Sequence, residues 1–224
     1  MIKFRRELVW PVLEPLTLEQ EHEDSQRTER IKSSIIKGDW SKSGEVALEE
    51  ARRLFDAEVD RRKGADAKAG IYLAAITALI PVLVSLLPNL WSDKINKGLG
   101  FISLIIFAGA VTYLLTAGAW AFRTLKVAGF ALVGPSEIAD SWNKSSPPAQ
   151  LAKHLARATL YNYPLGNKKV DGIKMTHEYL LRAFLSFTLL MVIQITWPVG
   201  AWMVETVGKL LEPKITVPLI MCFS

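Results

Sequence analysis

Three long apolar blocks without a charged residue constrain this chain more than any other feature. They are Ala69–Ser92, Gly98–Phe122 and Ala183–Val204, with 24, 25 and 22 residues. A helix rises 1.5 Å per residue, so each block spans about 33–37 Å as a helix, against a hydrocarbon core of about 30 Å. No segment alternates apolar and polar residues over a useful length. The sequence therefore predicts an all-α integral membrane protein with three transmembrane helices.

Basic residues gather on alternate sides of these blocks. Residues 1–68 carry fourteen Lys and Arg and residues 123–182 carry nine, whereas 93–97 and 205–224 carry two each. Because cytoplasmic segments of membrane proteins carry the excess of Lys and Arg, the N-terminus and residues 123–182 are expected in the cytoplasm. The short loop and the tail with the single cysteine, Cys222, are then expected outside.

Helix signals organise the first cytoplasmic part. Residues 1–16 contain two prolines and predict an extended arm. The T-L-E-Q run from Thr17 is a capping box that starts a helix ending at Lys37-Gly38. We expect one long helix from about 45 to 90, which projects from the bilayer before it enters it; a break at Gly64 is the alternative.

The segment between the second and third blocks predicts several short helices. One is expected over Ser136–Trp142 and another over about 147–160. The turn expected over Tyr161–Asn167 contains a proline and a glycine, and the last helix is expected to begin near 168–171 and to end or kink at Pro198. The chain then divides into five parts. Residues 1–68 form a cytoplasmic N-terminal arm and helical hairpin, 69–122 the first two transmembrane helices with a short outer loop, and 123–182 a cytoplasmic helical segment. Residues 183–204 form the third transmembrane helix and 205–224 an outer tail.

Signatures of catalysis are absent from the sequence. It has no P-loop, G-x-G-x-x-G, G-x-S-x-G, H-E-x-x-H or C-x-x-C pattern. The histidines His22, His154 and His177 are scattered without metal-ligand spacing. We expect no enzyme, no catalytic residue, no metal and no cofactor.

Polar residues inside the apolar blocks have two interpretations. Small and hydroxyl residues let helices pack closely, and polar groups also line water-filled pores. One chain with three spans cannot enclose a pore, so a pore requires a symmetric homo-oligomer, for which we favour a tetramer. The candidate pore-lining residues are Gly109, Thr112, Tyr113, Thr116 and Gln194.

The segment 123–182 is basic, with nine Lys and Arg against four acids, whereas residues 1–68 are nearly neutral. Attraction to anionic lipid headgroups explains such charge, and so does a phosphate-bearing ligand of modest size. The spacing of Lys153 and Arg157 places them one helical turn apart, able to reach successive phosphates. The candidate ligand-binding residues are Lys144, Lys153, Arg157, Lys168, Lys169 and Lys174.

Two stretches resemble a known group of proteins. Asp60–Leu83 (DRRKGADAKAGIYLAAITALIPVL) and Tyr161–Lys174 (YNYPLGNKKVDGIK) are similar to the membrane entries of small bacterial anti-phage transmembrane effectors, the SLATT, Pycsar and CBASS group, and most similar to the Hailong type. The resemblance implies an oligomeric ion channel of the bacterial inner membrane, governed by a DNA oligomer from a partner nucleotidyltransferase. Pycsar and CBASS relatives respond to cyclic nucleotides instead.

Two functions from different classes therefore remain. The first is a ligand-controlled channel that depolarises the inner membrane, governed by a DNA oligomer or a nucleotide second messenger. The second is a non-conducting membrane scaffold or partner-binding subunit. They differ in whether the polar faces of the spans meet around a water-filled axis.

Overall fold

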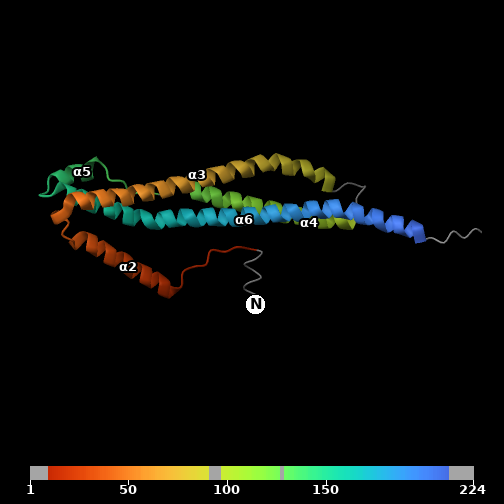
Figure 1. Cartoon of the computed structure of the whole chain (residues 1–224), viewed down its shortest axis with the longest axis horizontal. Helices are drawn as coiled ribbons and strands as arrows, with labels where there is room; N and C mark the ends of the chain where they lie inside the picture. Colours follow the sequence, from red (N-terminus) through yellow and green to blue (C-terminus); the bar gives the residue numbers. More distant parts are fainter. Residues whose placement is uncertain (1–9, 91–96, 127–128, 212–224) are drawn as a thin grey trace, which may run out of the picture.

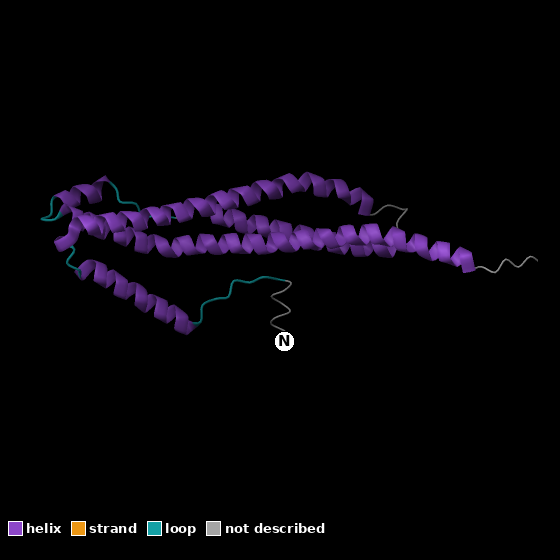
Figure 2. Ribbon diagram, in the orientation of Figure 1, coloured by secondary structure: helices purple, strands orange, loops and turns teal. Residues whose placement is uncertain are grey.

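The computed structural model describes residues 10–90, 97–126 and 129–211, and within these ranges it contains helices and no strand. Its elements, in chain order, are α2 (Leu18–Lys37), the 3-10 turn η1 (Ser41–Ser43), α3 (Gly44–Leu90), α4 (Lys97–Leu125), α5 (Pro135–Trp142) and α6 (Pro147–Leu211). Figure 1 follows them along the sequence, and Figure 2 shows the same view by secondary structure. The prediction of an all-α fold is confirmed for the described residues.

Three long helices lie side by side and form the body of the molecule (Figure 1). α3 has 47 residues, α4 has 29 and α6 has 65. Each contains a stretch long and apolar enough to cross a membrane, consistent with a multi-pass membrane protein. At 1.5 Å per residue α3 is about 70 Å long and α6 about 98 Å, so both continue well past their apolar blocks.

Several local predictions are confirmed. Thr17 caps α2: its hydroxyl accepts from the Gln20 amide at 3.2 Å, and its amide donates to the Gln20 side chain at 3.0 Å. The helix ends at Lys37 as expected. α3 passes Gly64 without a break. Residues 10–16 are free of helix, whereas residues 1–9, most of the loop 93–97 and Cys222 lie outside the described residues.

The turn predicted over Tyr161–Asn167 is wrong. α6 runs without interruption from Pro147 to Leu211, so neither a new helix near 168–171 nor an end at Pro198 occurs. Pro164 removes one helical donor, which normally costs about 3 kcal/mol in a helix interior. Contacts with α3 are available to offset this cost, because the Arg61 guanidinium donates to the Tyr163 carbonyl at 3.1 Å and to the Asn167 side chain at 2.8 Å.

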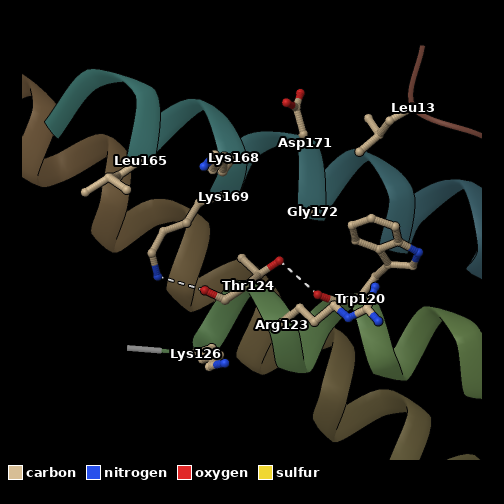
Figure 3. Close-up of a pocket in the computed structure, with 10 residues that line it drawn as sticks. All are labelled: Leu13, Trp120, Arg123, Thr124, Lys126, Leu165, Lys168, Lys169, Asp171 and Gly172. Atoms are coloured by element: carbon tan, nitrogen blue, oxygen red, sulfur yellow. Dashed lines mark hydrogen bonds between the residues drawn. The ribbon is translucent and has the colours of Figure 1, made fainter. Parts of the chain in front are cut away.

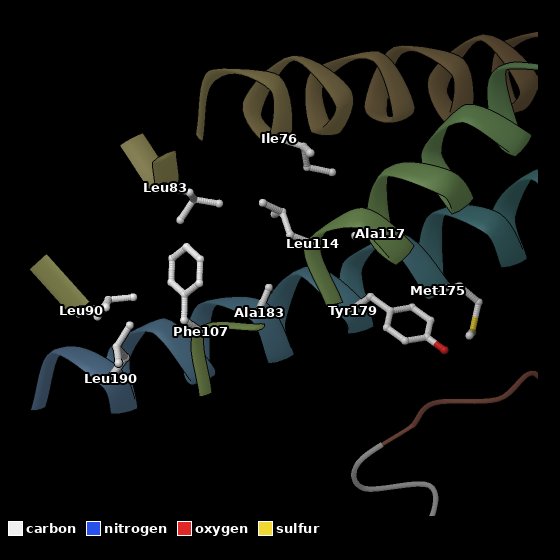
Figure 4. Close-up of a cluster of buried hydrophobic side chains, with 10 residues drawn as sticks. All are labelled: Ile76, Leu83, Leu90, Phe107, Leu114, Ala117, Met175, Tyr179, Ala183 and Leu190. Atoms are coloured by element: carbon white, nitrogen blue, oxygen red, sulfur yellow. The ribbon is translucent and has the colours of Figure 1, made fainter. Parts of the chain in front are cut away.

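Two apolar clusters hold the helices together. The larger one joins α3, α4 and α6 along the apolar blocks of α3 and α4, as Figure 4 shows, and its members Leu114 and Tyr179 are almost fully buried. The smaller one lies at the other end of the bundle, where Ala51 of α3 packs on Ala152 and Leu155 of α6. In this smaller cluster α3 packs on the start of α6, and α2 also packs on α6.

Candidate functional site

A polar contact joins all three long helices at the level where the apolar block of α3 begins and that of α4 ends. The Lys169 ammonium of α6 pairs with the Asp66 carboxylate of α3 and donates to the Thr124 carbonyl of α4 at 2.7 Å (Figure 3). Lys169 is 6% exposed and Asp66 about a third. A buried charge is tolerated only when paired and hydrogen-bonded, so this contact fixes the register of the three helices. We call Lys169, Asp66 and Thr124 the clasp.

A second polar layer lies farther along α3 and α6, away from the apolar blocks. The Arg61 guanidinium pairs with the buried Glu58 carboxylate at 2.8 Å and lies over the Tyr163 ring, 5.0 Å from its centroid. A Cβ at Gly166 would stand 2.2 Å from a Glu58 oxygen and 2.3 Å from an Arg61 nitrogen. A larger residue at this position would have to displace the ends of these two side chains, so Gly166 leaves room for the ion pair.

The same requirement recurs beside the clasp. A Cβ at Gly172 of α6 would stand 2.2 Å from the Thr124 hydroxyl oxygen of α4. That hydroxyl donates to the Trp120 carbonyl at 3.0 Å, so it is held in place (Figure 3). α4 and α6 are thus in backbone-to-side-chain contact just beyond the apolar block of α4.

Basic side chains meet in a cavity of about 730 Å³ between α2 and α6. Arg157 and Lys168 enter it from α6, and Lys32 enters from α2, where Glu29 pairs with it at 3.1 Å. Leu160 and Pro164 supply apolar wall. The cavity thus has two cations without a carboxylate partner among the described residues, Arg157 and Lys168, which is the donor set that phosphates prefer. We call it the α2–α6 cavity.

The structure separates the other predicted ligand-binding residues. Lys169 belongs to the clasp and its charge is neutralised there. The Lys153 ammonium donates to the Ile36 carbonyl at 3.3 Å and so holds the end of α2 against α6. Lys174 lines a different groove, together with the N-terminal arm, and Lys144 is exposed in the loop after α5.

The candidate pore-lining residues occupy different surroundings. Thr112 is exposed on the surface of the single chain and Thr116 is half-buried. Each hydroxyl donates at 2.8 Å to a carbonyl one turn earlier, so its lone pairs remain available to accept from water or to contact a cation. Gly109 and Gln194 are half-buried, and the space where a Gly109 Cβ would project is open.

Tyr113 faces the N-terminal arm. Its ring lies 6.0 Å from Trp10 and 6.3 Å from Tyr179 between ring centroids. The Tyr179 hydroxyl donates to the Pro11 carbonyl at 3.0 Å. The arm is therefore anchored on α4 and α6 by the ring contacts of Trp10 and by the hydrogen bond to Pro11.

Sequence reasoning missed the partners of the buried polar groups. Asp66 lies in the Asp60–Leu83 stretch, but no residue of that stretch indicates a contact with Lys169, which lies 103 residues farther along the chain. Asn162 is fully buried. Its side-chain oxygen accepts a hydrogen bond from the Ala131 amide at 2.8 Å, and its side-chain nitrogen donates to the Ala131 carbonyl at 2.9 Å. No local pattern signals such pairs, because they depend on the register of separate helices.

Comparison with known proteins gives no match to a family model, to a curated protein or to a solved structure. The site is therefore interpreted from its own geometry.

Proposed function

We propose that this chain is the subunit of a ligand-controlled ion channel, a membrane effector of bacterial anti-phage defence that depolarises the inner membrane. The defence role is suggested by the resemblance of Asp60–Leu83 and Tyr161–Lys174 to transmembrane effectors of that kind. In this proposal the N-terminus and residues 123–182 face the cytoplasm, and the signal is a DNA oligomer or a nucleotide from a partner nucleotidyltransferase.

The observation that carries the proposal is the α2–α6 cavity. Arg157 and Lys168 bring two cations into it from the same helix that continues into the third apolar block. A phosphate-bearing ligand that draws α2 toward α6 acts directly on a helix that spans the membrane. Such a ligand controls the channel only if it binds the open and closed states with different affinities.

The clasp supports the mechanical part of the proposal. It lies along α6 between the α2–α6 cavity and the apolar block, and it ties α6 to both α3 and α4. A displacement of α6 at the cavity therefore reaches the other two spans through the Lys169–Asp66 ion pair and the Lys169–Thr124 hydrogen bond.

Conduction itself is supported by the second span. Thr112 and Thr116 present hydroxyl oxygens on one face of α4, next to Gly109, where helices can approach closely. Several copies arranged around an axis would bring these oxygens to a shared pore; we propose a homotetramer, since closed rings are the usual assembly of identical chains. Its mass in mild detergent and in native lipid nanodiscs measures the copy number.

The ligand is tested by fluorescence anisotropy of labelled oligonucleotides and nucleotides on the purified full chain, across a salt series. We expect wild type to bind and Arg157→Gln/Lys168→Gln to bind at least tenfold more weakly, with a smaller salt dependence because two phosphate contacts are lost. The matched control is Lys42→Gln/Lys63→Gln, which removes the same charge from exposed positions on η1 and α3. Equal binding by the site variant and wild type, or no binding by wild type at low salt, contradicts ligand control through this cavity.

A further inference from the structure

A second basic cavity, of about 370 Å³, lies between α4 and α6 where α4 leaves its apolar block. It is distinct from the α2–α6 cavity, although Leu165 and Lys168 border both. Its cationic wall consists of Arg123, Lys126 and Lys168, and its apolar wall of Leu13, Trp120 and Leu165. Figure 3 shows these side chains around the space between the two helices. We call it the α4–α6 cavity.

The charges in this cavity are not all equivalent. The Lys169 ammonium also borders it but is held by the clasp, so it has no charge to offer a ligand. The Arg123 guanidinium lies over the Trp120 ring, 5.3 Å from its centroid, a contact that orients it without neutralising it. Neither Lys126 nor Lys168 forms an ion pair with any residue that the structure describes.

One acidic residue borders the same cavity. The Asp171 carboxylate points away from α4 and from the clasp in Figure 3, and it forms no ion pair with a described residue. It lowers the positive potential at the rim next to Leu13. The cationic side of the cavity is therefore the side of Arg123 and Lys126, and Lys168 adds a third cation from α6.

The position along α4 identifies the class of ligand. Trp120 is among the last residues of the apolar block, and Arg123 is the first charged residue after it. In a spanning helix this boundary lies at the headgroup level, where aromatic and basic side chains anchor proteins. Basic pockets between transmembrane helices at this level hold the headgroups of anionic lipids. The apolar wall of Trp120 and Leu165 suits the glycerol and first acyl carbons that accompany such a phosphate.

We propose that the α4–α6 cavity binds the phosphate of an anionic membrane lipid, with Arg123 and Lys126 as the principal donors and Lys168 as the third. The proposal does not rest on channel activity or on a soluble ligand, since a lipid held between α4 and α6 is a structural component whatever the protein conducts.

The test is the thermal unfolding of the delipidated full chain in mild detergent, titrated with short-chain phosphatidylglycerol. Short-chain phosphatidylcholine is the zwitterionic comparison, and glycerol phosphate tests whether the phosphate alone suffices. The site variant is Arg123→Gln/Lys126→Gln, neither of whose residues borders the α2–α6 cavity. The matched control is Lys42→Gln/Lys63→Gln. Should the double variant fail to fold, Lys126→Gln alone is used, since that side chain forms no ion pair with any described residue.

We expect saturable stabilisation by phosphatidylglycerol at concentrations at least tenfold below those required for phosphatidylcholine or glycerol phosphate. The site variant should need about 30-fold more phosphatidylglycerol, because each interfacial cation contributes about a fivefold factor, and the control should titrate like wild type. Equal responses to the two lipids, or equal titration by the site variant and wild type, overturn the proposal. Glycerol phosphate binding as tightly as the lipid would assign the cavity to a soluble phosphate compound and would also overturn it.

Discussion

Removing either partner of the clasp ion pair should destabilise the protein, and by unequal amounts. Asp66→Asn leaves the Lys169 ammonium 6% exposed, with the Thr124 carbonyl as its remaining partner in the clasp. Breaking a buried pair in this way costs about 3–5 kcal/mol. Lys169→Met instead leaves a carboxylate that is about a third exposed and has the Arg62 guanidinium 3.9 Å away. Solvent and this second cation reduce the cost, so we expect about 1–3 kcal/mol.

The double variant Asp66→Asn/Lys169→Met removes both charges and should cost less than the sum of the single variants, with a coupling of about 1–3 kcal/mol. The assay is unfolding in mixed micelles of a mild detergent and dodecyl sulfate, followed by tryptophan fluorescence and helical circular dichroism. A control pair, Glu49→Gln and Arg52→Gln, removes an exposed contact and should change stability by less than 1 kcal/mol. Additive single effects, or a larger cost for Lys169→Met than for Asp66→Asn, would refute the reasoning.

Three further predictions follow from the other contacts. Gly172→Ala should destabilise the protein by about 1–3 kcal/mol, because the alanine Cβ would lie 2.2 Å from the Thr124 hydroxyl oxygen. Adding Thr124→Ala should relieve most of that cost. Thermal unfolding of the two single variants and the double variant measures both effects. Thr112→Leu/Thr116→Leu should abolish membrane depolarisation on expression while leaving membrane insertion intact, and full depolarisation would move the pore to another span. The thiol of Cys222 should react with an impermeant maleimide in intact cells, since the predicted topology places the tail outside, and a fused reporter that behaves as cytoplasmic would overturn the three-span topology.

Features that depend on neighbouring residues could be predicted from the sequence. The capping box at Thr17, the stop at Lys37 and the long helix through Gly64 each follow from local chemistry that the fold does not override. The apolar blocks are long enough that their helical state needs no tertiary information.

Features that depend on a partner far along the chain could not be predicted from the sequence. Pro164 and Gly166 are turn residues in isolation, yet both lie inside α6. There Gly166 faces Glu58 and Arg61 of α3, and Arg61 also donates to the carbonyl of Tyr163, next to Pro164. Lys169 has the sequence signature of a ligand-binding lysine, and only the register of α6 against α3 reveals Asp66 as its partner. The sequence could have predicted that Arg157 and Lys168 lie on one side of α6. They are 11 residues apart, and that spacing returns to nearly the same face of a continuous helix. The turn predicted over Tyr161–Asn167 interrupts the helix between these two residues, so their shared face was not predicted.

Ion flux through purified protein tests the central proposal most directly. The full chain is reconstituted into vesicles of phosphatidylcholine and phosphatidylglycerol with a potassium gradient, and the membrane potential is followed with a voltage-sensitive dye, with and without oligonucleotide or nucleotide. We expect wild type to dissipate the potential in one of these two conditions and not in the other, and Arg157→Gln/Lys168→Gln to lose that difference. A potential that wild type leaves intact in both conditions would contradict the channel and favour a non-conducting scaffold.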